Sequence, residues 1–206
     1  MGIFRKGLGI SRVAETNNDL AKMVEVPPVN IEDYPAVKEW LDAHWDDIEH
    51  RQDQGCTPYN LRNCAYMPDF EKPKICWKAV GRNLAFAIVE PDVFLSAPAS
   101  FLTFNSADET ATNYLLGMLQ SSLAKYQIYS SSDTTGAGDI MLNIQSLTRC
   151  VFNEFEGTIE QLEIAEAVKS FSEGKFTVEE TDRKINGCVA KLYNFTEEEK
   201  KFLEEV

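Results

Sequence analysis

Hydrophobic side chains recur at helical spacing in two stretches of the chain. In residues 34–50 they fall three and four positions apart, and Pro35 suits the first turn, where a missing N–H costs nothing. A second stripe runs through residues 113–126. Both patterns predict amphipathic helices with one face in a core. The side chains expected to be buried are Val37, Trp40, Leu41, Leu115, Leu119 and Leu123.

Short runs of aliphatic and aromatic residues, interrupted by glycine and proline, predict β-strands. A loop of small residues at 130–139 separates the earlier runs from the later ones. The expected strands are residues 74–80, 84–89, 100–104, 140–144 and 149–152.

The last fifty or so residues carry explicit helix start signals. Thr158, Thr177 and Thr196 each stand three positions before a Glu or Gln. In this capping box, the hydroxyl and the longer side chain each accept a hydrogen bond from a backbone N–H of the first turn. We therefore predict three helices in this region.

These elements together predict an α+β fold, with a mixed β-sheet core, packed helices and a C-terminal helical tail. We expect an extended lead-in at 1–30, an α+β domain at 31–155 and a helical tail packed on that domain at 156–206. No apolar stretch approaches the roughly 20 residues of a membrane span, and the N-terminus lacks the apolar segment of a secretory signal. No membrane partner is therefore expected.

The five cysteines are an odd number without a Cys-x-x-Cys pair. This favours reduced thiols and a cytoplasmic location.

Charge is distributed unevenly along the chain. The formal net charge is −13, which by itself argues against nucleic acid, because Lys and Arg contacts to phosphate supply most of the affinity for DNA. Residues 51–89, however, contain six basic and three acidic side chains, whereas residues 154–206 contain seven basic and fourteen acidic ones. The positive region lies in the middle of the chain.

Catalytic and cofactor-binding patterns are missing from the sequence. The two histidines, His44 and His50, stand beside no nucleophile motif, and their spacing to Cys56 and Cys64 matches no common structural zinc pattern. The glycine-containing loop at 134–138 is neither a Walker nor a dinucleotide-binding motif. We expect no cofactor, no metal and no enzymatic activity of the chain by itself, and an enzyme with an unrecognised site is the third-ranked alternative.

Residues 51–82 interleave basic and aromatic side chains, a mixture suited to phosphate contacts with stacking beside them. In the alternative interpretation the aromatic residues are core and the Lys and Arg side chains form a solvated face. Composition alone favours that alternative.

Several segments, in order, resemble the TaqI-like C-terminal specificity domain. They are Tyr-Pro-Ala-Val-Lys at 34–38, Arg-Gln-Asp-Gln-Gly at 51–55, Tyr-Asn-Leu-Arg at 59–62 and Phe-Glu-Lys-Pro-Lys-Ile at 70–75, followed by Trp77. Residues 114–123 resemble the family's LLGILNS helix, with Gln120 where Asn is usual. Residues 192–199 resemble its LYGLTEEE turn, with Asn194 at the glycine position, a residue that tolerates a left-handed helix cap. The resemblance covers most of residues 30–206.

This family is the target-recognition domain of adenine-specific DNA methyltransferases and of type IIG restriction-modification enzymes. The resemblance implies that the chain reads double-stranded DNA beside a methyltransferase domain, and possibly a nuclease domain, of a parent enzyme or separate catalytic subunit. The resemblance favours the interpretation that residues 51–82 form a DNA-facing surface over the interpretation that they are core and solvated face. The residues expected to bind DNA are Arg51, Tyr59, Arg62, Lys72, Lys74, Lys78 and Arg82.

Within this set, lysines are expected to contact phosphates, and Arg62 and Arg82 suit bidentate contacts with guanine. The competing hypothesis is a protein-interaction module, in which the acidic tail docks on a partner or mimics DNA. The net charge of −13 supports it.

Overall fold

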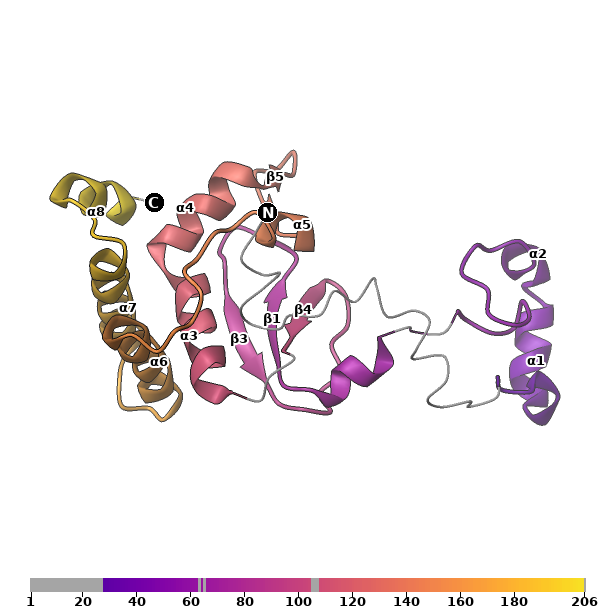
Figure 1. Ribbon diagram of the computed structural model, residues 1–206. Coiled ribbons are helices and arrows are strands. Elements are labelled where there is room, and N and C mark those ends of the chain that lie inside the picture. The colour runs from indigo at the N-terminus through magenta and orange to yellow at the C-terminus, as the bar shows by residue number, and fades with distance from the viewer. Residues whose placement is uncertain (1–27, 63, 65, 105–107, 206) are drawn as a thin grey trace. The chain divides into compact units, whose positions relative to one another are not determined.

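The computed structural model describes residues 28–62, 64, 66–104 and 108–205 (Figure 1). They form two compact units, with the boundary between Met67 and Pro68. That boundary falls inside the segment predicted as one domain, and residues 156–205 belong to the larger unit. Most of the predicted lead-in at 1–30 lies outside the described residues. The predicted α+β class is confirmed, because helices are combined with two small antiparallel sheets.

The main sheet of the larger unit has β1 (Lys74–Lys78) at its centre. β3 (Phe86–Val89) pairs with one edge of β1 and β4 (Ala99–Thr103) with the other, both antiparallel. Three of the predicted strand runs therefore form strands close to their expected positions. Trp77 of β1 is buried, and its indole N–H donates to the Leu142 carbonyl at 2.9 Å.

A second sheet has the strand order β2 (Val80–Gly81), β6 (Ile140–Met141) and β5 (Asp133–Thr134). All the described pairings are antiparallel, so the expected mixed sheet was wrong in this respect. β6 is shorter than predicted because the Asn143 side chain accepts from the Ser146 N–H at 2.9 Å and begins a helix. The run at 149–152 forms no strand.

Helices cover one side of the main sheet in the view of Figure 1. The helices after Thr103 are α3 (Glu109–Gln120), α4 (Ser122–Ser131), α5 (Ile144–Leu147), α6 (Ile159–Ser172), α7 (Val178–Leu192) and α8 (Glu197–Glu204). α3 contacts β3 on one side and α6 on the other, and α7 packs on α6. The predicted C-terminal tail therefore packs on the rest of the larger unit.

The helix predicted at 113–126 is two helices, α3 and α4, separated by Ser121. Ser121 has an extended backbone, and its buried hydroxyl donates to the Met118 carbonyl and accepts from the Ala124 N–H. One side chain therefore ends α3 and begins α4. Gln120 donates its side-chain N–H to the Phe86 carbonyl at 3.1 Å, which fastens the end of α3 to β3.

The predicted starts of the last three helices are confirmed. Thr158, Thr177 and Thr196 each form a capping box with the Gln or Glu three positions later. Asn194, after α7, adopts the predicted left-handed conformation with φ 54°.

α3 lies at the centre of the hydrophobic core, and residues 111–119 are all buried. Leu115 and Leu119 are buried as predicted, whereas Leu123 is partly buried and packs at the edge of the core. α3 needs small residues where α6 crosses it. A Cβ placed on Gly117 would lie 2.4 Å from Ile164 Cγ2 on α6. The Ile164 side chain therefore packs directly on the α3 backbone, and only glycine leaves room for it.

Gly117→Ala is therefore expected to push α3 and α6 apart. Inserting a methyl group into a packed interior costs about 1–3 kcal/mol, which outweighs the gain of less than about 1 kcal/mol in helix propensity. Denaturant unfolding measures the change, and Gly187→Ala on α7 is the control, because a Cβ at Gly187 meets nothing within 4 Å. A stabilised Gly117→Ala protein would show that the helices do not approach this closely.

The smaller unit contains the 3-10 helix η3 (Ile31–Asp33), α1 (Pro35–Asp42) and α2 (Trp45–Ile48). The predicted helix at 34–50 is thus interrupted at His44, whose φ and ψ are −117° and 27°. The prediction that Val37 and Trp40 are buried was wrong, since they are 50% and 61% exposed, and Leu41 is partly buried. The helical stripe is present, but at least half of the surface of Val37 and Trp40 is exposed.

Candidate nucleic-acid interface

Residues 51–62 of the smaller unit form a hairpin-like loop, here called the hairpin loop. Gln54 and Leu61 form an antiparallel bridge, the Gly55 N–H donates to the Asn60 carbonyl at 2.7 Å, and the Arg62 N–H donates to the Asp53 carbonyl at 2.8 Å. A Cβ on Gly55 would lie 2.5 Å from the Leu61 carbonyl oxygen, so glycine is required at this turn. Backbone hydrogen bonds between its two sides therefore close the loop.

Arg51 supports this loop from within. It is partly buried, its Nη2 donates to the Asn60 carbonyl at 2.9 Å, and its Nε lies 3.5 Å from Asp53 Oδ1. Arg51 therefore holds both sides of the loop, and the structure does not present it as a freely projecting cation.

Tyr59 fastens the loop to α1. Its hydroxyl donates to Asp42 Oδ1 at 2.6 Å, and the Tyr59 ring centroid lies 5.4 Å from that of Trp45. Lys38 Nζ donates to the other oxygen of the same carboxylate, Asp42 Oδ2, at 3.0 Å. The Tyr59 hydrogen bond, followed by the one from Lys38, lowers the pKa of the Asp42 carboxyl. The predicted stacking residue is therefore already in contact with side chains of its own unit.

Arg62, at the end of the hairpin loop, is exposed. No carboxylate among the described residues lies within ion-pair distance of its side chain. The exposed Gln52, which the sequence interpretation did not single out, is a second side chain of the loop with paired donor and acceptor groups. The hairpin loop thus presents a guanidinium and an amide to solvent.

Lys74, in contrast, lies in the interior of the larger unit. It is 0% exposed, and its Nζ donates to the carbonyls of Phe70, Lys72 and Glu90 at 2.8, 3.0 and 3.0 Å. All three of its donors are used within the chain. We therefore remove Lys74 from the candidate DNA contacts.

Lys72 is also engaged locally. Its Nζ lies 2.6 Å from Asp69 Oδ1, and the Asp69 side chain is 9% exposed. Since a contact with phosphate would compete with this pair, Lys72 is a weaker candidate than the sequence suggested.

Lys78 and Arg82 occupy one corner of the larger unit, where β1 ends and β2 follows. Lys78 is exposed, and a Cβ on Gly81 would lie 3.6 Å from Lys78 Cδ, so the lysine side chain passes over the backbone next to Arg82. The Arg82 side chain is 78% exposed, with Nε 3.5 Å from Asp139 Oδ1. We call this pair the Lys78–Arg82 corner.

The predicted site residues therefore separate into two exposed groups and a set with structural roles. Arg62 lies in the smaller unit, and Lys78 and Arg82 lie in the larger one. The structural set consists of Arg51, Tyr59, Lys72 and Lys74.

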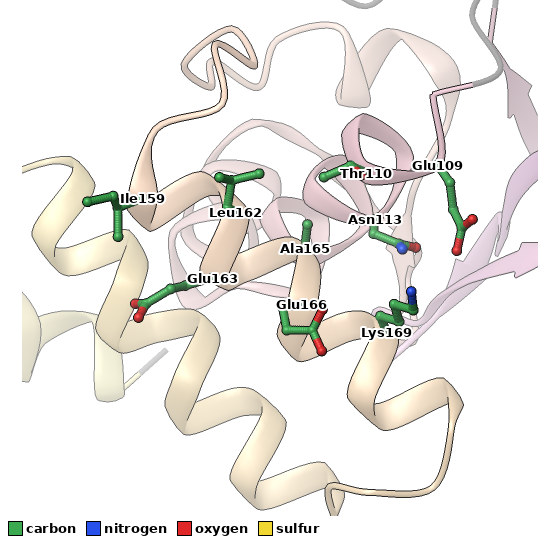
Figure 2. Close-up of a pocket in the computed structure, with 9 residues that line it drawn as sticks. All are labelled: Glu109, Thr110, Asn113, Ile159, Leu162, Glu163, Ala165, Glu166 and Lys169. Atoms are coloured by element: carbon green, nitrogen blue, oxygen red, sulfur yellow. The ribbon is translucent and has the colours of Figure 1, made fainter.

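The larger unit also has a groove of about 510 Å³ between the start of α3 and α6 (Figure 2). Glu109 lines it from α3, and Glu163, Glu166 and Lys169 line it from α6. Three carboxylates and a single lysine give the groove the wrong sign for phosphate. This groove is therefore not part of the candidate nucleic-acid interface.

In the described part of the chain, no three His, Cys, Asp or Glu side chains are arranged to hold a metal ion. All five cysteines are free, and burial raises the pKa of the Cys150 and Cys188 thiols to about 11, which keeps them protonated and weakly nucleophilic at neutral pH. Among the described helices, none has the length and apolar character needed to cross a bilayer.

No protein-family model matches the chain, and no curated protein matches it. These comparisons neither support nor contradict the resemblance to the TaqI-like specificity domain.

Proposed function

We propose that the chain is a DNA target-recognition module of an adenine-specific methyltransferase of a bacterial restriction-modification system. The observation that carries the proposal is the hairpin loop, whose backbone is closed by hydrogen bonds and which ends in the exposed Arg62. Arginine can contact two acceptors of guanine at once, so an exposed guanidinium at the end of such a loop suits base recognition. The resemblance of residues 30–206 to the specificity domains supports the same assignment.

In this proposal the Lys78–Arg82 corner contacts phosphates, which position a protein on the duplex without reading its sequence. Arg82, which the sequence suggested for guanine, is assigned to phosphate because its Nε lies 3.5 Å from Asp139 Oδ1, which occupies part of the guanidinium. The chain has no catalytic role by itself and uses no cofactor. A methyltransferase domain or subunit modifies the adenine, with a nuclease domain as a further possible component of the same enzyme. The proposal places the chain in the cytoplasm, where its five cysteines would stay reduced.

Affinity of the isolated chain for DNA is expected to be low. Few exposed cations remain once the structural set is removed, and non-specific binding by a handful of phosphate contacts gives dissociation constants of roughly 10⁻⁴–10⁻⁶ M. Acidic residues beyond a few Debye lengths, each about 8 Å at physiological salt, reduce this affinity little. Asp53, whose carbonyl accepts from the Arg62 N–H, is close enough to lower the positive potential at Arg62 and contributes to the low affinity.

The double substitution Lys78→Glu and Arg82→Glu is expected to weaken binding to every duplex and to reduce the slope of log K against log salt by roughly two, about one per phosphate contact. Arg62→Ala is expected to cost about 1–3 kcal/mol on the cognate sequence only. Fluorescence anisotropy with a pool of short random duplexes, titrated at several salt concentrations, measures the first effect. Selection of bound sequences from that pool measures the second.

Arg183→Ala on α7 is the matched control, because Arg183 is exposed and lies outside both groups. Its affinity and salt slope should equal those of the wild type. Equal effects of all these substitutions, or no binding of the wild-type chain at low salt, would refute the DNA-recognition proposal.

A protein-interaction role is the second candidate, and the α3–α6 groove favours it. Ile159 and Leu162 of the groove are 73% and 45% exposed, next to the three glutamates that line it. This combination suits a basic, partly apolar segment of another protein. If DNA binding fails in the experiment above, this candidate becomes the better one.

A further inference from the structure

The two faces of the main sheet have different surroundings. Directly opposed residues of paired strands point to the same face, and side chains alternate between the faces along each strand. Ile75, Trp77 and Phe86 point to the helical face, where they are buried in the core together with α3. The alternate residues of the same strands point to the second face, and they include Lys74, Cys76, Lys78, Ala87, Ala99 and Phe101. The core with α3 therefore lies on one side of the sheet.

The second face is covered at its Lys74 end. The Phe70 ring of η4 (Met67–Glu71) packs on the Phe101 ring with centroids 4.9 Å apart, and the carbonyls of Phe70 and Glu90 bind Lys74 Nζ. At the other end of this face three side chains are exposed, namely Lys78, Ala87 and Ala99. We call these three residues the open sheet face.

The strands of this sheet carry no acidic side chain. β1, β3 and β4 contain two lysines and no Asp or Glu. The sequence stretches 72–89 and 93–104, which include these strands, also lack acidic residues. The main sheet is thus an acid-free part of a chain whose net charge is −13.

Two carboxylates outside the strands affect the charge at the open sheet face. Glu90 stands four residues after Phe86, the end of β3 nearest Lys78, and is therefore roughly 14 Å away along the strand. Asp139 Oδ1 lies 3.5 Å from Arg82 Nε and offsets the charge of Arg82. Lys78 is therefore the principal cation of this surface.

The acidic helices α6 and α7 lie on the helical side of the sheet, beyond α3 (Figure 1). Their acidic residues are Glu160, Glu163, Glu166, Glu179, Glu180 and Asp182. Because packed helices lie about 8–10 Å apart and α3 separates α6 from the sheet, these carboxylates are roughly 20 Å from the open sheet face. This is more than two Debye lengths of about 8 Å at physiological salt, so their charge is largely screened there.

We infer that duplex DNA lies across the open sheet face, with its phosphates against Lys78 and the acidic helices turned away. The alanines beside Lys78 project only one carbon from the strands, so the DNA backbone can approach the sheet closely. Arg82 follows Gly81, over which the Lys78 side chain passes, and contacts the same DNA backbone beside Lys78. The role of this face rests on the proposed function, which it extends from the Lys78–Arg82 corner to a surface of the sheet.

The side chains of this face favour a duplex over a single strand. Proteins that bind single-stranded nucleic acid stack its bases on exposed aromatic rings beside their basic residues. None of the three residues of the open sheet face has a ring, and the neighbouring Phe101 is partly buried against Phe70. A lysine among alanines offers a phosphate contact without base stacking.

Ala99→Glu tests the open sheet face without removing a cation. Ala99 stands directly opposite Lys78 on β4, so a glutamate there places a carboxylate beside the Lys78 ammonium. Opposite charges at such positions stabilise a sheet, so the urea midpoint should not fall. Affinity for a short duplex, measured by fluorescence anisotropy, should fall about threefold or more at low salt, and the salt slope should decrease by about one. Ala99→Gln, which adds similar bulk without charge, should bind like the wild type.

Ala87→Lys tests the same face by a gain of affinity, which loss of the fold does not explain. Ala87 is exposed on β3 opposite Cys76, so the new lysine adds a phosphate contact without standing directly opposite Lys78. Binding should tighten about threefold or more at low salt, and the salt slope should increase by about one. Arg183→Glu on α7 is the control for net charge, because it changes the charge more than either variant but on the helical side, and its affinity should be unchanged.

Unchanged affinity of both Ala99→Glu and Ala87→Lys, with the wild type still bound, would refute the open sheet face and leave the proposed function standing. If Ala99→Glu lowers the urea midpoint, the result for Ala87→Lys decides alone. An equal effect of Arg183→Glu would show that net charge, and not this face, governs binding. A matched single strand that binds more tightly than the duplex would also overturn the inference. No binding of the wild-type chain at low salt would refute the proposed function, and this surface with it.

Discussion

Replacing Lys74 by methionine should destabilise the larger unit by about 2–5 kcal/mol, although methionine has a similar length and an apolar side chain. Each buried polar group that loses its hydrogen-bond partner costs about 1–3 kcal/mol. Lys74 serves three carbonyls, and the Phe70 carbonyl keeps a second donor, the Asp92 N–H, so the loss falls mainly on the other two. The gain from burying an apolar side chain does not restore those bonds.

The three carbonyls come from different parts of the chain. Phe70 belongs to η4 (Met67–Glu71), Lys72 precedes β1, and Glu90 follows β3. The Phe70 carbonyl also accepts from the Asp92 N–H at 2.8 Å, so this carbonyl binds both Lys74 and the segment after β3. Lys74 therefore fixes η4 and the segment after β3 to the central strand.

Urea unfolding followed by circular dichroism measures the effect. Lys78→Met is the matched control, because Lys78 lies at the exposed end of the same strand and exposed substitutions usually change stability by less than about 0.5 kcal/mol. Equal stability of the Lys74→Met and wild-type proteins would mean that Nζ reaches solvent. Lys74 would then return to the set of candidate phosphate contacts.

This prediction also changes how DNA binding is tested. A Lys74→Glu protein that fails to bind DNA would be uninformative, because a carboxylate among three carbonyls destabilises the fold. Lys72→Glu has a similar problem, since it faces the buried Asp69. Lys78 and Arg82 are the suitable positions for substitution because their side chains are exposed.

Signals within a few residues were predicted well from the sequence. The three capping boxes specify hydrogen bonds over three positions, and all three helices begin where they predict. The core stripe of α3 was also identified, since Leu115 and Leu119 are buried. The break between α3 and α4 was missed because the hydrophobic stripe continues past Ser121, from Leu119 to Leu123, at helical spacing. Only the tertiary position of Ser121 shows that its hydroxyl serves two helices.

The candidate site was harder to predict because burial of a cation is a tertiary property. Lys74 and Lys78 stand four residues apart in the same run, yet one is enclosed by carbonyls and the other lies in solvent. Sequence composition gives them equal weight. Their separation of four positions predicts the same sheet face, so the difference arises from η4 and the segment after β3, whose carbonyls enclose the Lys74 ammonium at one end of β1.

The stripe of α1 shows a different limit. Periodicity correctly indicated an amphipathic helix but not the surface that covers it, and the assumption that the same domain provides this cover was wrong for Val37 and Trp40. An apolar helix face is equally compatible with a core and with an interface.

Leu119→Ala should reduce the free energy of unfolding by about 2–5 kcal/mol, the range for deleting an enclosed leucine side chain. Leu119 is 0% exposed on α3, the helix between β3 and α6, so the neighbours on both sides would have to move to fill the space. The close contact at Gly117 limits that movement, because α3 and α6 already touch there. A cavity therefore persists, and the cost should lie in the upper half of the range.

The same deletion on the surface separates this packing effect from other losses. Leu162 of α6 is 45% exposed, and Leu162→Ala should cost less than half as much in the same urea titration. A small apolar molecule such as benzene should raise the midpoint of Leu119→Ala but not that of Leu162→Ala, because only a closed apolar cavity binds it. Equal costs for the two substitutions would mean that α3 does not lie at the centre of the core. The positions of β3, which contacts α3, and of the Lys78–Arg82 corner would then be wrong as well.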